Sequence, residues 1–144
     1  MQVTWNTIAA IAKTTAIDLW LLFPLGTGAN RLLKRDGQIP ASWRARLDAT
    51  FGSTDWYDAF YQKLEYQDLL SGQPMVEMHK QATFATIIAY FLRRLGTVFP
   101  HVAENPLPLF NSANCPLYLL CFAAGNPGSG GRTGVKIAQD ILKP

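Results

Sequence analysis

The sequence predicts one α/β domain in which a short sheet packs among helices. The segments 17–23 and 117–124 are apolar at both strand parities, which is typical of strands covered on both faces. Amphipathic segments with helical spacing lie at both ends of the chain, over 4–13 and 132–143. The length of 144 residues fits a single domain, and 49% hydrophobic and 12% aromatic residues are enough for a core.

The helices are expected from the spacing of apolar residues and from the glycines and prolines that bound them. The segment from Trp56 to Leu70 is rich in aromatic residues and stops before Gly72. The segment from Val76 to Leu95 has the broadest apolar stripe and stops at Gly96. In chain order, helices are predicted over 4–13, 29–35, 43–51, 56–70, 76–95 and 132–143, and the stretch from about 28 to 95 is a helical insert.

The strands are expected at 17–23, at 98–110 and at 117–124. The first ends at Pro24, and prolines interrupt the second, which suits an edge or irregular strand. A buried strand normally follows a helix that leads in from a parallel neighbour. No strand is expected ahead of 17–23, so the sequence predicts that the leading strands of this sheet lie outside the chain.

Composition and charge exclude several classes of function. The 13 basic and 10 acidic residues leave a net charge of +3, which by itself indicates neither a nucleic-acid nor a membrane partner. The apolar run at 16–25 is shorter than the ~20 residues of a membrane span, and the amino terminus lacks the pattern of a secretory signal. Cys115 and Cys121 have no metal-site spacing, so a cytoplasmic protein with free thiols is expected.

The stretch "PLGTGANR" follows the carboxyl end of an apolar strand, where ligands collect in open α/β sheets. Gly26, Thr27 and Gly28 are therefore weak candidates for contacts with a cofactor. The full dinucleotide fingerprint would need glycine where Arg31 stands. A plain tight turn explains the same residues.

A basic segment follows the glycines. It comprises Arg31, Lys34, Arg35, Trp43, Arg44 and Arg46. Such residues bind phosphates, and a tryptophan among them can stack on bases. Solvated helix faces have the same sequence pattern, so nucleic-acid binding and a plain surface both remain open.

Other chemically active residues have structural explanations. Asp18 is expected at the exposed amino end of its strand. The aromatic residues of the acidic 56–70 segment could form a stacking platform, but core packing explains them better. His79 and His101 lack neighbouring nucleophiles or ligands, so no catalytic or metal-binding residue is assigned.

Three runs of this sequence can be compared with a known family: "TWNTIAAIAKTTAIDLWLLFPLGTGANRLLKRDGQIPASWRARLDATFGSTDWY", "NSANCPLYLLCFAAGNP" and "KIAQDIL". Together they resemble the carboxyl-terminal half of the three-Cys-motif partner protein family. The resemblance spans essentially the whole chain. It implies half of a Rossmann-like sheet of the class I methyltransferase kind. In that family the segment like Met1–Trp5 follows an Asp-Pro-aromatic-Gly strand end. By this analogy 17–23 is the fifth strand, 98–110 the sixth, and 117–124 an antiparallel seventh between them.

The resemblance also implies what this half lacks. The glycine-rich loop, the ribose-binding acid and the Asp-Pro-x-Gly motif that would bind S-adenosylmethionine belong to the other half, so no such residue carries over. A three-Cys-motif, radical-SAM-like protein is the implied partner, in phage, mobile-element or DNA-repair settings.

Three hypotheses follow. The chain is a truncated methyltransferase-like protein, inactive until it meets its missing half, a copy of itself or the three-Cys-motif protein. Alternatively, the insert is a module that binds protein or nucleic acid. The third and weakest hypothesis is a complete small cofactor enzyme that uses the "PLGTG" turn.

Overall fold

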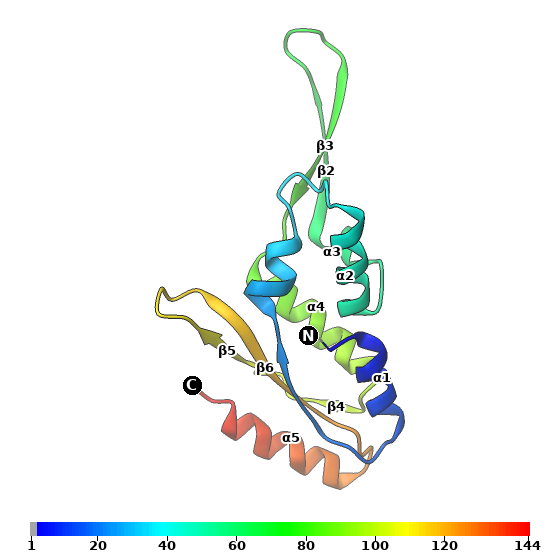
Figure 1. Ribbon diagram of the computed structural model, residues 1–144, viewed down its shortest axis with the longest axis vertical. Helices are drawn as coiled ribbons and strands as arrows, with labels where there is room; N and C mark the ends of the chain where they lie inside the picture. Colours follow the sequence, from blue (N-terminus) through cyan, green and yellow to red (C-terminus); the bar gives the residue numbers. More distant parts are fainter. Residues whose placement is uncertain (1–2) are drawn as a thin grey trace.

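The computed structural model describes residues 3–144 and shows a mixed α/β body from which a long hairpin projects (Figure 1). The helical elements are α1 (Trp5–Lys13), the π-helical segment η1 (Leu25–Asn30), α2 (Ala41–Phe51), α3 (Trp56–Phe60), α4 (Phe84–Gly96) and α5 (Ser129–Ile141). The strands are β1 (Leu19–Phe23), β2 (Tyr61–Gln67), β3 (Pro74–Lys80), β4 (His101–Val102), β5 (Leu107–Phe110) and β6 (Pro116–Ala124).

The body is built on a four-stranded sheet with β6 at its centre. Strand β1 pairs with one edge of β6, and β4 and β5 follow one another along the other edge, all antiparallel to β6. Leu120, for example, is opposite Leu22 on one side and Leu107 on the other. The predicted position of the 117–124 strand, antiparallel and between the two others, is confirmed.

Helices cover the two faces of this sheet unequally. One face packs against α1, η1, α2, α3 and α4 in a large core, in which Phe23 of β1 stacks on Phe91 of α4 with ring centroids 3.9 Å apart. On the other face, a small cluster joins Phe122 and Ala124 of β6 to Ala138 of α5 and to Leu142, which directly follows that helix. The single helix α5 therefore covers only part of that second face.

The prediction that the first strand is buried on both faces is wrong. Leu21 and Phe23 are buried, but Trp20 and Leu22, which point to the other face, are 45% and 54% exposed. The reason is the position of β1 at the edge of the sheet, away from α5. Among the residues that the structure describes, β1 pairs with β6 alone.

The predicted helix at 56–70 is wrong beyond Phe60, and the predicted helix at 76–95 is wrong before Phe84. Helix α3 ends at Phe60, and the chain continues as β2 and β3, an antiparallel pair in which Leu64 is opposite Glu77. The turn between them contains Gly72 at a φ of +64°, which glycine adopts without strain. Helix α4 begins only after Thr83, whose side chain accepts from the Thr86 amide in a capping box.

The other helix predictions are closer. The segments 4–13 and 43–51 form α1 and α2, and the terminal helix begins at Ser129, three residues before its predicted start at Arg132. The turn expected at Gly26 and Gly28 is instead η1, and helical structure starts at Leu25 rather than Ala29.

The alternating burial of β1 provides a matched pair of substitutions. Leu21→Asp places a carboxylate in the core, where burial without a partner costs about 3 kcal/mol or more. Leu22→Asp places the same group on the exposed face, and its effect is expected to stay within about 0.5 kcal/mol. Thermal unfolding followed by circular dichroism compares them, and equal melting temperatures would contradict the assigned faces.

Candidate functional site

An open cavity lies at the carboxyl end of β1. Its volume is about 340 Å³, and its wall includes Leu22 and Phe23 from β1, Thr27 and Gly28 from η1, and Arg46 from α2. Leu21 and Leu22, which point to opposite faces of β1, both line it, together with Val3 and Ile8, so the cavity runs along the outer edge of this strand. Its lining is of mixed character, with apolar side chains from β1, the threonines Thr27 and Thr50, and the cationic side chain of Arg46.

The three glycine-turn candidates have different surroundings. Thr27 and Gly28 line the cavity, whereas Gly26 packs against the start of β6. A Cβ atom on Gly26 would lie 2.1 Å from the Pro116 carbonyl oxygen. The close approach of η1 to β6 therefore explains Gly26 without a ligand, while Thr27 and Gly28 stay candidate contacts.

Gly26→Ala tests the packing role. The added methyl group must displace backbone, so a loss of stability of about 1–3 kcal/mol is expected. Gly96→Ala is the control, because nothing lies within 4 Å of a Cβ there and alanine favours the helix. Chemical denaturation measures both, and an unchanged Gly26→Ala midpoint would contradict the close contact.

The basic segment does not form one continuous patch. Arg46 lines the β1 cavity, whereas Arg44 lies on another side of α2 with its guanidinium 4.5 Å from the Tyr57 ring. The Lys34 ammonium lies 5.9 Å from the Trp43 ring. Arg31 is exposed just after η1, and Arg35 lines a separate hollow at the base of the hairpin. The residues predicted to bind nucleic acid are thus divided among at least two surfaces.

The aromatic residues around α3 are used for packing. Trp56 is fully buried, and its indole nitrogen donates to Asp48 at 2.7 Å. The Tyr57 ring stacks on Tyr61 at 4.6 Å and also receives Arg44. The ring of Tyr57 is therefore occupied by its own neighbours. The core-packing explanation is confirmed for Trp56 and Phe60, both 0% exposed.

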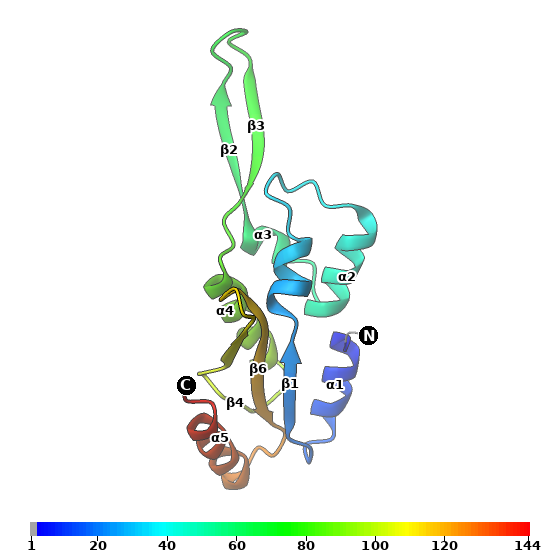
Figure 2. The same cartoon turned by 60° about the vertical axis from the view of Figure 1, so that its left-hand side comes forward.

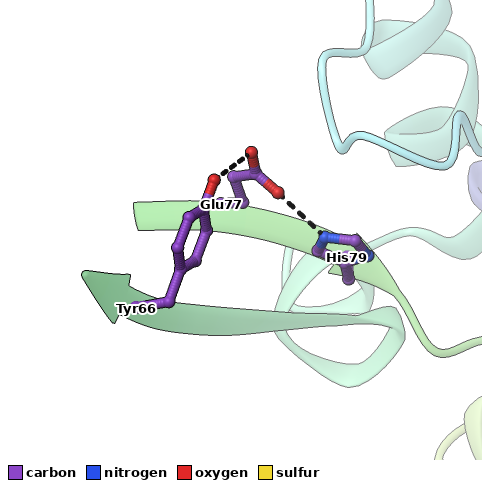
Figure 3. A network of polar contacts seen from close by, with 3 residues as sticks. All are labelled: Tyr66, Glu77 and His79. Atoms are coloured by element: carbon purple, nitrogen blue, oxygen red, sulfur yellow. Dashed lines mark hydrogen bonds and ion pairs between the residues drawn. The ribbon is translucent and has the colours of Figure 1, made fainter. Parts of the chain in front are cut away.

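A second hollow lies where the hairpin joins the body. Its volume is about 660 Å³, and it is lined by side chains of both signs, among them Arg35, Asp36, Glu77 and His79. Figure 3 shows the polar network beside it. The Tyr66 hydroxyl donates to one Glu77 oxygen at 2.6 Å, and His79 Nε2 lies 3.2 Å from the other.

Sequence reasoning did not find this network, since Tyr66 and Glu77 become neighbours only through the register of β2 and β3. The hydrogen bonds from Tyr66 and then His79 lower the pKa of Glu77, and the bond to Glu77 raises the pKa of the Tyr66 hydroxyl. All three side chains are exposed, and the network contains no nucleophile poised beside a base. The Tyr66–Glu77 bond links the two strands of the hairpin, and the His79–Glu77 contact lies within β3.

The network makes a prediction about pH. A carboxyl group whose pKa is lowered in the folded state stabilises that state at pH values above its ordinary pKa of 4.5. This contribution is lost as the pH falls through the lowered pKa. Tyr66→Phe should therefore raise the pKa of Glu77, which a carboxyl NMR titration measures. Tyr118→Phe, at an exposed tyrosine elsewhere, should leave that pKa unchanged. An unaltered Glu77 titration in Tyr66→Phe would contradict the network.

The remaining candidates are structural. Asp18 is exposed one residue before β1 and accepts from the Gly125 amide at 3.2 Å, as expected for a strand end. Cys115 is exposed and Cys121 is buried, and burial raises the pKa of the Cys121 thiol to about 12. His101 Nε2 lies 3.1 Å from the Pro127 carbonyl oxygen. Within residues 3–144, no three His, Cys, Asp or Glu side chains are grouped as a metal site would require.

The fold and these sites define a mixed α/β protein with small antiparallel sheets. No family model, curated protein or solved structure matches the chain. None of the helices described in residues 3–144 combines the length and the apolar character that crossing a membrane requires.

Proposed function

We propose that this chain supplies the carboxyl-terminal strands of a methyltransferase-like α/β domain and acts only when further strands add to the free edge of β1. The main support is that edge. Leu19 to Phe23 are hydrogen-bonded to β6 on one side, and the cavity of about 340 Å³ runs along the other. An unpaired strand edge offers its amide and carbonyl groups to a strand from another segment.

The uncovered face beside this edge supports the same proposal. Trp20, Leu22 and Tyr118 are 40–54% exposed on the face that α5 leaves open. Ile137 and Ile141, one helical turn apart on α5, are 57% and 61% exposed. An α/β sheet normally buries such a face under a helix. The added segment would thus bring both a strand for the edge and a helix for the face.

The strand arrangement is compatible with the resemblance noted in the sequence. A central antiparallel strand between two parallel ones matches the fifth, seventh and sixth strands of a class I methyltransferase-like sheet. On this proposal S-adenosylmethionine is bound by the added segment, and the chain alone is not an enzyme. Met1 and Gln2, part of the stretch that would join the two segments, lie outside the described residues.

Reconstitution tests the proposal. The chain is co-expressed with the amino-terminal half of a three-Cys-motif partner protein that ends at its Asp-Pro-aromatic-Gly strand. We expect the two to co-purify, the amides of 19–23 to become protected from hydrogen exchange, and S-adenosylmethionine to bind the complex in calorimetry. Trp20→Lys combined with Leu22→Lys should abolish co-purification, while Glu104→Lys, an exposed change beyond the opposite edge of the sheet, should not.

Two results would contradict the proposal. Stoichiometric binding of S-adenosylmethionine by the chain alone would favour the small cofactor enzyme instead. Complex formation without added protection of 19–23 would show that the edge of β1 is not the contact.

The structure also contains an observation that favours a protein-interaction role for the insert. The insert, residues 28–95, carries nine basic and seven acidic side chains, so its net charge is only +2. The hairpin residues 61–80 have a net charge of −1, from Lys63, Lys80, Glu65, Asp68 and Glu77. The hairpin tip exposes Leu69 and Leu70 almost completely, at 99% and 97%. Exposed apolar side chains on a projection with no excess of positive charge suit a protein partner better than a phosphate backbone.

A further inference from the structure

The β2–β3 hairpin is an arm with little support beyond its base (Figures 1 and 2). A two-stranded hairpin alone is marginally stable in water, and this one exposes apolar side chains along both strands. These side chains are 40–53% exposed and belong to Leu64, Tyr66, Met75 and Val76. Such an arm is stabilised by any contact that adds strands to it.

The two edges of the arm are not equally free. At the base, the Lys80 amide on β3 donates to the Arg35 carbonyl at 2.9 Å, and the segment between η1 and α2 lies on the β3 side of the arm (Figure 2). Among the described residues, the outer edge of β2 pairs with nothing. An added strand would therefore meet β2.

We propose that β2 pairs antiparallel with β2 of a second copy of this chain, with the two-fold axis at Leu64. This inference concerns a different surface from the free edge of β1. In this register Lys63 is opposite the partner's Glu65, and Glu65 is opposite the partner's Lys63. Two symmetric ion pairs form across the new strand boundary, and the two Leu64 side chains meet on the other face.

Charge selects this register over its neighbours. An axis at Lys63 would set two lysines opposite each other, and an axis at Glu65 would set two glutamates opposite each other. Like charges directly across a strand pair are destabilising, and opposite charges are favourable. At the β3 edge, the corresponding central axis at Glu77 would pair two glutamates.

The geometry also places the arm tips. Tyr61 at the base is opposite Gln67 of the partner, so the two arms overlap along all of β2 and the two bodies lie at opposite ends. Seven paired residues extend ~23 Å at 3.3 Å per residue. Each tip, with Leu69 and Leu70, then lies level with α3 of the partner. The exposed leucines gain a surface to pack on.

Charge reversal tests the pairing directly. The native chain should dimerise reversibly in analytical ultracentrifugation. Lys63→Glu and Glu65→Lys should each raise the dissociation constant about tenfold or more, because each turns both ion pairs into like-charge pairs. The doubly reversed chain should dimerise again, and a mixture of the two single variants should form heterodimers. Both side chains are more than half exposed, so the fold tolerates the changes.

Cross-linking tests the register. In a Cys115→Ser background, Leu64→Cys should form a disulfide-linked dimer under mild oxidation. Met75→Cys, equally exposed but on β3, should not. The reversal Asp140→Lys on α5 is the control for general charge effects and should leave the dissociation constant unchanged.

The outcomes are decisive in both directions. A native chain that stays monomeric at its highest soluble concentration would overturn the proposal. So would a dimer that is insensitive to both single reversals, or equal cross-linking at Leu64→Cys and Met75→Cys. None of these results bears on the β1 edge, which the reconstitution experiment tests separately.

Discussion

The body of the protein depends on the central position of β6. This strand has both edges paired in the described chain, with β1 on one side and β4 and β5 on the other. Its alternating side chains divide the core in two, since Leu119 and Cys121 join the large cluster while Phe122 and Ala124 join the small one under α5. Each of the other strands is held in the sheet by its pairing with β6. The outer edge of β1, which faces away from β6, is therefore less constrained than the edge that pairs with it.

The features of the fold that could be predicted from the sequence are those that depend on residues close together in the chain. The apolar runs at 17–23 and 117–124 identify strands, and proline positions locate the irregular edge strand. The burial of a strand could not be predicted in the same way. A run that is apolar at both parities shows which side chains a strand could bury, but not whether a helix covers them. Trp20 and Leu22 look like core residues in sequence, yet no described helix lies over them.

The arm was missed for a related reason. The spacing of apolar residues such as Tyr61, Leu64 and Met78 is compatible with a helix and also with a strand. Pairing with a distant segment decides which of the two structures forms. The pairing of β2 with β3 and the capping box at Thr83 together end the hairpin and start α4. The candidate site shares this limit. Thr27 and Gly28 could be named from the glycine pattern, but Tyr66, Glu77 and His79 depend on the strand register.

The two free edges differ in chemistry, and this difference bears on what each can bind. The edge of β1 is flanked by exposed Trp20 and Leu22, so any strand that brings apolar cover is accommodated and charge gives little selection. The edge of β2 carries Lys63 and Glu65, which form an ion pair of 2.6 Å within the strand. Charges on an edge strand discourage indiscriminate pairing. An edge of this kind accepts only a partner whose charges alternate in the opposite sense, and an antiparallel copy of β2 is such a partner.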